Sequence, residues 1–477
     1  MLFNSVPFLF FFSCVYAIYV VLGHRAQNRL LLAASYFFYG CWNPKLLGLI
    51  VLSTVVDYVC GLGIEASTDP VRRRRLVTVS VVTNLGILGC FKYFDFFVVS
   101  LGALLEGMGI PIEPLRLDLV LPVGISFYTF QTMSYTLDVY RGRVSAARKP
   151  LDFALYVAFF PQLVAGPIER GAHFLPQVQN ERTISWERLR TGAWLIVLGY
   201  FQKVVIADNM APVADAVFAR PGELGPLETL TGIYAFAFQI YCDFAGYSNI
   251  ARGLAALMGF DLMANFRMPY FALNPSDFWK RWHISLSSWL RDYLYIPMGG
   301  NRGTARETRA NLIATMLLGG LWHGAAWNFV AWGGFHGLLL VGHRALERRF
   351  RRSAPRRPLP AALWTGARMF CFFHLVCFGW LLFRAVALRD VPLMLASVVG
   401  LSGRPVAATP DLMLFWAFAF ATLLPLLVIE IAQERGRDLL ATERWAPSRR
   451  LAMGLVLFAF IVVVGATGGD EFIYFQF

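Results

Sequence analysis

The sequence MLLGGLWHGAAWNF, residues 316–329, places a single histidine, His323, inside an otherwise apolar stretch. A charged side chain at membrane depth costs about 3 kcal/mol or more, so such a residue marks a candidate functional site. Because imidazole titrates close to neutral pH, His323 is suited to proton transfer. The alternative is a neutral imidazole that is hydrogen-bonded between helices.

Apolar sequence of this kind extends along the whole chain. The 477 residues are 57% hydrophobic and only 15% charged, whereas soluble domains are typically about a quarter charged. Long apolar runs occur from residues 6–22 to residues 451–466, and a helix needs about 20 such residues to cross a bilayer. No segment between them fits a soluble domain, so we expect one polytopic all-α membrane domain covering residues 1–477.

The net charge of +13 is concentrated in short loops. These loops are residues 72–75, 141–149, 302–309, 344–357 and 435–450. Such clustering is typical of cytoplasmic loops, with a secondary attraction to anionic lipid. It disfavours nucleic acid as a partner.

The basic loops also predict the topology. The first apolar run lacks a basic leader and a small-residue cleavage site, so it is expected to remain as a span. Residues 152–168 are interrupted by Pro161, Gly166 and Pro167, which predicts a re-entrant segment buried in protein. The tail, residues 468–477, is expected on the periplasmic or extracellular side. Crossings are expected at 5–23, 29–41, 46–64, 76–100, 119–137, 191–207, 228–258, 361–385, 411–432 and 451–467.

Residues 274–297 predict an amphipathic helix in the inner membrane interface. Asn274 and Pro275 form a favourable N-cap and first-turn pair. Aromatic and aliphatic residues follow at helical spacing, and the opposite face is polar. The apolar positions are Phe278, Trp282, Leu286, Trp289 and Tyr293, and the polar ones are Lys280, Arg281, Ser285, Ser288 and Asp292.

Residues 311–343 are too short for two full spans between two basic loops. We therefore expect a buried hairpin of partial helices, in which Gly319, Gly320 and Gly324 permit the break. His323 would then lie at the turn, deep in the protein. Non-helical backbone at that depth requires burial in protein or a cavity.

Other polar residues are candidates for the same site. His283 lies midway along the interfacial helix, either as an interfacial anchor or as a residue that shapes a ligand site. Asp243 sits in an apolar run and must be paired or hydrogen-bonded. Gln131 and Ser134, like Trp322, could line a polar tunnel or serve structure, for example by bonding between helices.

Several kinds of chemistry lack sequence support. The seven cysteines form no CxxC pair or Cys/His cluster, so we expect no metal site. There is no P-loop, GxSxG elbow or dinucleotide-binding fingerprint in a βαβ setting. Chemistry carried by one or two histidines and a hydroxyl is therefore favoured.

Five ordered motifs together resemble the membrane-bound O-acyltransferase family, and within it the bacterial branch that serves alginate O-acetylation. They are LPVGISFYTFQ at 121–131, AGPIER at 165–170, DFWKRWHISLSSWLRDYLYIP at 277–297, GGNR at 299–302 and GGLWHG at 319–324. The resemblance implies a bundle of about ten or more transmembrane helices, with re-entrant and interfacial helices around a central tunnel. It also implies a catalytic histidine at His323 and a second, less strictly required one at His283.

The resemblance further implies an acyl thioester donor from the cytoplasm, no bound cofactor, and a hydroxyl acceptor on the far side of the bacterial inner membrane. The chain ends DEFIYFQF, residues 470–477. In bacterial members a similar aromatic tail carries a tyrosine proposed to accept the acyl group, and Tyr474 matches its place. The alternative is an interfacial aromatic anchor.

The leading hypothesis is transmembrane O-acetyl transfer. Acetyl-CoA, or an acyl-carrier thioester, would enter from the cytoplasm, and His323 would act as base on an attacking hydroxyl. A periplasmic partner acyltransferase would then modify an exported or cell-envelope polysaccharide such as alginate. The donor phosphates would be held by Lys280, Arg281, Arg302 and Asn301.

Two rival hypotheses remain open. The first is D-alanyl transfer to teichoic acid or peptidoglycan O-acetylation within the same family. The second is a proton-coupled transporter in which His323 and Asp243 form a relay. Inverted repeats would favour the transporter, and we detect none in the sequence.

Overall fold

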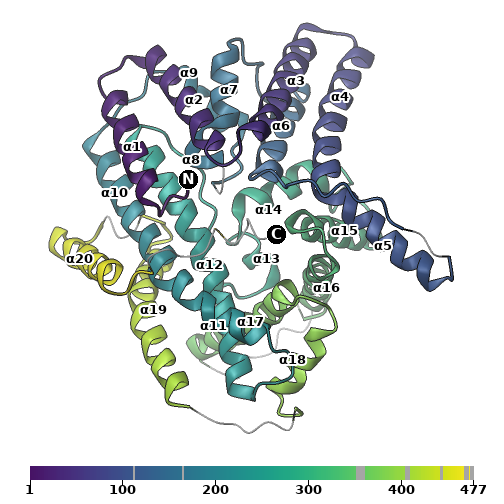
Figure 1. Ribbon diagram of the computed structural model, residues 1–477, viewed down its shortest axis with the longest axis vertical. Coiled ribbons are helices and arrows are strands. Elements are labelled where there is room, and N and C mark those ends of the chain that lie inside the picture. Colours follow the sequence, from purple (N-terminus) through teal and green to yellow (C-terminus); the bar gives the residue numbers. More distant parts are fainter. Residues whose placement is uncertain are drawn as a thin grey trace. The chain divides into compact units, whose positions relative to one another are not determined.

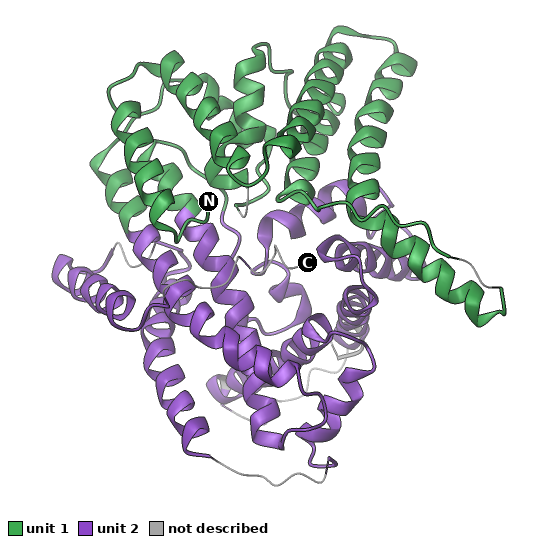
Figure 2. Ribbon diagram, in the orientation of Figure 1, with its two compact units in different colours: residues 1–193, 251–263 green, residues 194–250, 264–477 purple. Residues whose placement is uncertain are grey.

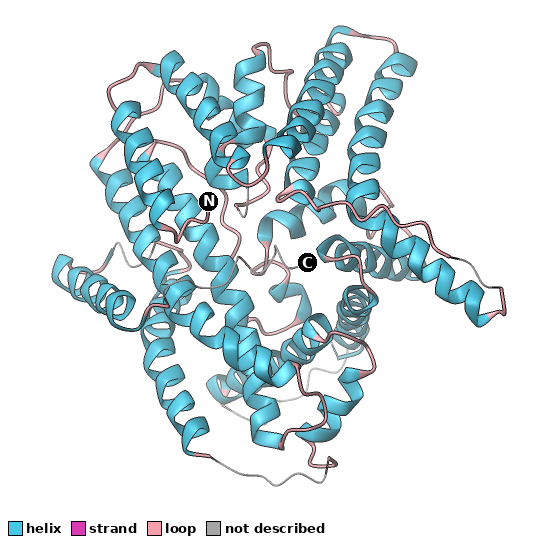
Figure 3. Ribbon diagram, in the orientation of Figure 1, coloured by secondary structure: helices cyan, strands magenta, loops and turns pink. Residues whose placement is uncertain are grey.

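A computed structural model describes residues 1–110, 113–163, 166–350, 360–402, 409–440, 444–466 and 472. Within these ranges all regular structure is helical, and loops connect the helices without any strand (Figure 3). The all-α prediction is confirmed for this part of the chain.

Within the ranges that the structure describes, six helices are long and apolar enough to cross a membrane. They are Pro44–Ala66, Pro70–Gly107, Trp186–Phe218, Ala362–Arg384, Pro410–Gly436 and Pro447–Val464. Other predicted crossings form shorter helices, such as α1 (Val6–Tyr19, 14 residues) and α6 (Ile125–Tyr140, 16 residues). A helix of 14 residues is only about 21 Å long, less than the roughly 30 Å of a bilayer core.

The chain forms two compact units, which Figure 2 distinguishes by colour. Unit 1 comprises Met1–Ala193 and Ala251–Met263, and unit 2 comprises Trp194–Ile250 and Ala264–Phe477. The boundaries fall inside two helices, α10 (Trp186–Tyr200) and α12 (Pro226–Leu257).

Unit 1 contains the first nine helices, which Figure 1 labels. Besides α1 and α6, these are α2 (His24–Gly40), α3 (Leu47–Ala66), α4 (Pro70–Leu88), α5 (Phe94–Gly107), α7 (Pro150–Ala158), α8 (Phe160–Leu163) and α9 (Gly171–Gln179). Helix α6 packs against α3 and α4, while α7 packs against α2 and α9.

A buried polar network joins α3, α4 and α6. The Asp57 carboxylate, on α3, accepts hydrogen bonds from Ser80, from the Asn84 amide at 2.7 Å and from the Thr136 hydroxyl at 2.8 Å. Interhelical bonds of this kind stabilise membrane bundles, since an unsatisfied carboxylate in hydrocarbon would be costly.

The segment predicted to be re-entrant is interrupted in the structure. Helix α7 ends at Ala158 and the short α8 covers Phe160–Leu163. The side chains from Leu155 to Leu163 are buried, so the irregular backbone at Phe159 is enclosed by protein, as membrane depth requires.

Unit 2 contains the remaining helices. They are α11 (Asp208–Phe218), α13 (Pro275–Phe278), α14 (Ile284–Leu290), α15 (Ala305–His323), α16 (Trp327–Phe350), α17 (Ala361–Arg384), α18 (Asp390–Val398), α19 (Pro410–Gly436) and α20 (Pro447–Val464), with π-helices at Phe201–Ala207 and Arg291–Tyr295.

Helices α15 and α16 form the hairpin that carries His323. Their lengths, 19 and 24 residues, correct the expectation of partial helices. The two backbones come close at glycines: a Cβ added at Gly320 would lie 2.2 Å from the Phe329 carbonyl oxygen, and one at Gly333 would lie 2.2 Å from that of Met316. Small residues at such crossings allow membrane helices to pack at short range.

The segment 274–297 is not the continuous amphipathic helix that the pattern predicted. It consists of α13, an irregular stretch, α14 and a π-helix. The irregular stretch forms hydrogen bonds with residues 265–267 instead. The Arg267 N–H donates to the Arg281 carbonyl at 2.9 Å, and the Ile284 N–H donates to the Asn265 carbonyl at 2.8 Å. The break therefore results from contacts that helical periodicity does not reveal.

Candidate active site

His323 is the last residue of α15 and lies at the turn of the hairpin. Its side chain is almost fully buried, with 3% of the residue exposed. Three aromatic rings surround it, with centroids 5.1 Å (Trp332), 5.2 Å (Trp322) and 5.5 Å (Phe383) from the imidazole. The structure therefore surrounds this histidine with aromatic rings inside unit 2.

His283 lies beside it. The two imidazole centroids are 6.2 Å apart, and Trp322 contacts both rings. His283 is fully buried, and its ring meets the edge of Phe244 at 4.7 Å. The two histidines that the sequence proposed as catalytic are thus brought together by different elements of the same unit.

The backbone at His283 is left-handed, with φ of 42°. A non-glycine residue in that region costs about 1–3 kcal/mol and persists only where its surroundings impose it. Asn265 supplies that support: its carbonyl accepts the Ile284 N–H, its side-chain oxygen accepts the Ser285 hydroxyl at 2.6 Å, and its amide donates to Ser248 at 3.0 Å. The sequence analysis missed Asn265, because only the tertiary fold brings it to this turn.

Burial lowers the pKa of His283 to about 3. An imidazole with that pKa stays neutral at physiological pH, and it is a weak general base there. A neutral imidazole still donates one hydrogen bond and accepts another. The electrostatics therefore favour a hydrogen-bonding or orienting role for His283.

Asp243, which needed a partner, has one in Lys203. The Lys203 ammonium lies 2.7 Å from carboxylate oxygens of both Asp243 and Asp208, and all three side chains are buried. Lys203 belongs to the π-helix Phe201–Ala207, a feature that often accompanies functional sites. Lys203 was not among the predicted site residues, although an acid in an apolar run requires a partner.

The end of the chain is tied to this part of unit 2. The Ala466 N–H donates to the Val204 carbonyl at 2.9 Å. Further on, Phe472 is fully buried, with its ring 4.6 Å from Tyr247 and 5.5 Å from Phe244. Phe244 also contacts His283. Tyr474 itself lies outside the described residues.

Of the residues expected to hold the donor, one is engaged in ion pairs and three are exposed. The Arg281 guanidinium is engaged by two carboxylates, Asp277 at 2.8 Å and Glu434 at 2.6 Å. Its role in the structure is therefore to bind α13 to α19. Lys280 is exposed, and Asn301 and Arg302 lie in an exposed turn.

Gln131 and Ser134 lie on α6 of unit 1. The Gln131 amide donates to the Tyr156 carbonyl at 2.6 Å, and the Ser134 hydroxyl donates to the Gln131 carbonyl at 2.7 Å. The Gln131 bond joins α6 to α7, and the Ser134 bond lies within α6. Among the described residues no group of three His, Cys, Asp or Glu side chains is arranged to hold a metal ion.

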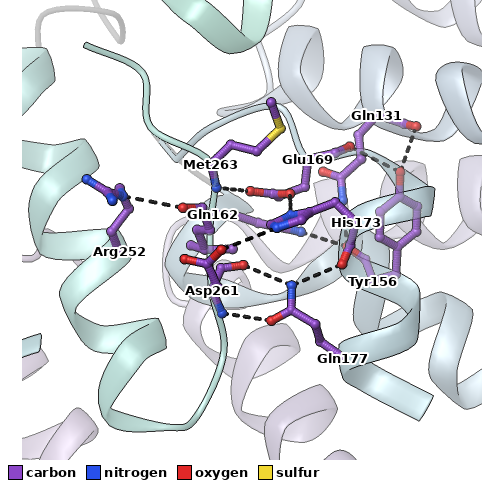
Figure 4. Close-up of polar contacts among 10 residues, drawn as sticks. Gln131, Tyr156, Gln162, Glu169, His173, Gln177, Arg252, Asp261 and Met263 are labelled. Atoms are coloured by element: carbon purple, nitrogen blue, oxygen red, sulfur yellow. Dashed lines mark hydrogen bonds and ion pairs between the residues drawn. The ribbon is translucent and has the colours of Figure 1, made fainter. Parts of the chain in front are cut away.

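Unit 1 also contains a cluster that the sequence analysis did not find. Figure 4 shows the His173 ring between the carboxylates of Glu169, at 2.8 Å, and Asp261, at 3.3 Å. Glu169 also accepts the Met263 N–H, and Gln177 exchanges hydrogen bonds with the Asp261 backbone. The cluster fastens α9 to the loop that follows α12.

Hydrogen bonds to Asp261 and Glu169 raise the pKa of His173 to about 10, and His173 in turn lowers the pKa of Asp261. Burial raises the pKa of Glu169, and its contact with His173 opposes that rise. His173 is therefore protonated at neutral pH and forms an ion pair with Asp261. Glu169 and His173 are four residues apart in the sequence, but Glu169 precedes α9, so only the fold shows that they pair.

The structure is that of a helical membrane protein with two buried histidines near the turn of a helical hairpin. Comparison with known proteins identifies its class. The sequence model described as MBOAT, membrane-bound O-acyltransferase family, matches residues 143–383. The chain belongs to this family and is a multi-pass membrane O-acyltransferase, as its motifs predicted.

Three curated relatives illustrate the range of the family. A probable alginate O-acetylase of Azotobacter vinelandii is 44% identical over 81% of this chain and 75% of its own length. A peptidoglycan O-acetyltransferase of Helicobacter pylori is 37% identical over 84% of this chain and 80% of its own length. A teichoic acid D-alanyltransferase of Streptococcus thermophilus is 31% identical over 55% of this chain and 68% of its own length.

Proposed function

We propose that the protein moves an acetyl group from a cytoplasmic thioester, acetyl-CoA, across the bacterial inner membrane for O-acetylation of an exported or cell-envelope polysaccharide such as alginate. The observation that carries the proposal is the buried pair of imidazoles 6.2 Å apart, His283 and His323. Identity of 44% to a probable alginate O-acetylase and of 37% to a peptidoglycan O-acetyltransferase supports acetyl as the group transferred.

His323 is the general base in this proposal. It takes the proton of the acceptor hydroxyl as that oxygen attacks the thioester carbonyl carbon. The new C–O bond forms, the C–S bond breaks, and the proton returns from His323 to the leaving thiolate. The surrounding rings of Trp322, Trp332 and Phe383 exclude water, which would otherwise hydrolyse the thioester.

His283 is the orienting partner. Since its imidazole is neutral, it can donate a hydrogen bond to the thioester oxygen, on which negative charge develops. Such a donor needs a fixed direction, and the support that Asn265 gives to the left-handed turn supplies one.

Tyr474 is the proposed acceptor of the first transfer. A tyrosine has a pKa near 10 and needs a base to become nucleophilic. Phe472 precedes Tyr474 by two residues in the sequence. Its ring contacts Phe244, and the ring of Phe244 also contacts His283. Substitution of Tyr474 distinguishes this role from the alternative, an interfacial aromatic anchor.

The remaining roles are assigned as follows. Lys280, Arg302 and Asn301 would attract the donor phosphates from the cytoplasm, whereas Arg281 would act through its bonds to α13 and α19. A periplasmic acyltransferase partner would pass the acetyl group to the polysaccharide. Only the acyl group would then cross the bilayer, and coenzyme A would remain in the cytoplasm.

The test is release of coenzyme A from acetyl-CoA by the full-length protein in lipid nanodiscs, with an acceptor present. His323→Gln should lower the rate about 100-fold or more, since general-base catalysis contributes at least that much. The matched control is His374→Gln, which changes a histidine on α17 that bonds to Tyr234. Thermal unfolding checks that both variants fold.

A wild-type rate in a folded His323→Gln variant would remove His323 from the mechanism. Proton-coupled transport without coenzyme A release would favour the transporter. Faster turnover with a D-alanyl carrier thioester than with acetyl-CoA would favour the D-alanyl alternative.

A further inference from the structure

An open polar cleft in unit 1 is unused by the proposed reaction. It has a volume of about 240 Å³ and forms where α3 ends, α4 begins and α6 turns into the following loop. Its polar lining includes Glu65, Arg73, Gly142, Arg143 and Ser145.

Among the residues that the structure describes, no carboxylate forms an ion pair with Arg73, which lines the cleft. One guanidinium nitrogen donates to the Tyr140 carbonyl at 2.9 Å, and the guanidinium lies 5.6 Å from the centre of the Tyr140 ring. Its Nε is buried and has no hydrogen-bond partner within the described part of the chain. A buried donor left unsatisfied costs about 1–3 kcal/mol, so an acceptor in the cleft would stabilise the protein.

The acidic groups of the cleft do not supply that acceptor. Glu65 is matched by Arg148 at 2.5 Å and by the Ala146 N–H at 2.9 Å. Asp138 lies 3.6 Å from Arg143. Arg73 therefore adds a positive charge that the acids in and near the cleft leave uncompensated.

The position of the cleft indicates where an anion would come from. Helices α3 and α4 belong to segments apolar enough to cross the membrane, Pro44–Ala66 and Pro70–Gly107, and the cleft lies at the ends where they meet. The arginine run 72–75 marks those ends as the cytoplasmic surface of the bilayer. Basic pockets between helices at that surface bind phosphate-containing lipid headgroups.

We propose that this cleft is a phosphate-binding site, with Arg73 as its principal ligand and Arg143 and Ser145 at its rim. The phosphate reaches it from one of two sources, the headgroup of an anionic phospholipid in the inner leaflet or a soluble phosphate compound. Arginine suits either source, because its planar guanidinium presents several donors to phosphate oxygens.

The experiment compares wild type, Arg73→Gln and Arg74→Gln, each full length, in phosphatidylcholine nanodiscs with and without phosphatidylglycerol. Bound lipid is counted by native mass spectrometry. Wild type should retain phosphatidylglycerol in preference to phosphatidylcholine, and Arg73→Gln should weaken that preference about fivefold. Arg74→Gln removes the same charge from an exposed neighbour that does not line the cleft, so it should keep the preference.

A second arm adds inorganic phosphate or coenzyme A in pure phosphatidylcholine. Arg73-dependent binding of these compounds, without a preference for phosphatidylglycerol, would assign the site to a soluble phosphate. Equal losses in the Arg73 and Arg74 variants would overturn the proposal, because surface charge alone would explain them. If Arg73→Gln does not fold, Arg143→Gln tests the same cleft, and an unchanged lipid preference there would count against it.

Discussion

His283 combines an unfavourable backbone conformation with complete burial, and Asn265 supports that backbone conformation. Asn265 bonds to the backbone at Ile284 and to the side chains of Ser285 and Ser248. Such support fixes the direction of a catalytic side chain, and errors of about 1 Å in that direction can cost 100-fold in rate. We therefore regard Asn265 as a positioning residue for the proposed reaction.

Replacing this asparagine tests that role. Asn265→Ala should lower kcat by about tenfold to 100-fold with little change in KM for acetyl-CoA, because the proposed His283 hydrogen bond strengthens only as charge develops on the thioester oxygen in the transition state. Steady-state coenzyme A release measures both constants. Asn180→Ala, at an exposed asparagine, is the control. A variant with normal kcat would show that the His283 turn holds its shape without Asn265.

At this scale the sequence identified the residues whose chemistry is unusual for their surroundings. His323 and Asp243 stood out because ionisable groups are costly in apolar sequence, and the structure places both as buried residues. Lys203 and Asn265 did not stand out, because their importance depends on partners that the fold brings together. The engagement of Arg281 by Glu434 was unpredictable for the same reason.

The α15–α16 hairpin depends on close backbone contact. A methyl group at Gly320 would lie 2.2 Å from the Phe329 carbonyl oxygen, whereas one at Gly342, on α16, would meet nothing within 4 Å. Gly320→Ala should therefore destabilise the protein by about 1–3 kcal/mol and lower activity, since His323 ends the same helix. Gly342→Ala should be neutral or slightly stabilising. Unfolding in denaturant compares the two, and equal stabilities would refute this account of the packing.

The His173 cluster links α9 to the loop after α12, and its contribution to stability depends on pH. A histidine whose pKa is raised contributes its stabilisation fully below the ordinary value of 6.5, and loses it as the pH rises towards about 10. Asp261, whose pKa is lowered, contributes above its ordinary value of 3.8 and loses that contribution in acid. The ion pair therefore stabilises the protein most between about pH 3.8, the ordinary pKa of Asp261, and pH 6.5, the ordinary pKa of His173.

His173→Gln should reduce stability most at about pH 5 to 6, by about 0.2–1 kcal/mol, because Asp261 is exposed and solvent screens the pair. The difference from wild type should shrink as the pH approaches 10. Thermal unfolding across that pH range measures the difference in stability. Asn180→Ala is the control, because Gln177→Glu would add charge. A difference independent of pH would mean that the cluster does not act through ionisation.

Helix boundaries in this protein were predictable where apolar length alone decides them. The first helix, α1, and the three helices α17, α19 and α20 lie close to the ranges expected. The interfacial segment 274–297 was not predictable in this way, because residues 265–267 take hydrogen bonds that a continuous helix would use. The hairpin helices also proved longer than the basic loops indicated.

On the scale of the whole molecule, the architecture follows from composition, and its function follows from a few long motifs. An all-α membrane chain was certain from the shortage of charge, whereas its division into two units has no marker in the sequence. The division falls inside α10 and α12, whose apolar patterns continue across it.

The aromatic tail, residues 470–477, is proposed to act together with the histidine pair. Tyr474→Phe removes only the hydroxyl, so it should abolish polysaccharide acetylation if that oxygen carries the acyl group. Tyr474→Ala also removes the ring and serves as the comparison. Normal acetylation by Tyr474→Phe, with loss in Tyr474→Ala, would establish the anchor and refute the relay.

The left-handed backbone at His283 sets two kinds of selection against each other. Asparagine tolerates that conformation and fills part of the space that glycine would leave empty, so a screen that rewards only thermal resistance should enrich asparagine at this position. A screen that rewards acetylated product should restore histidine. Retention of the costlier residue would then mark position 283 as one where natural selection has kept activity at the expense of robustness.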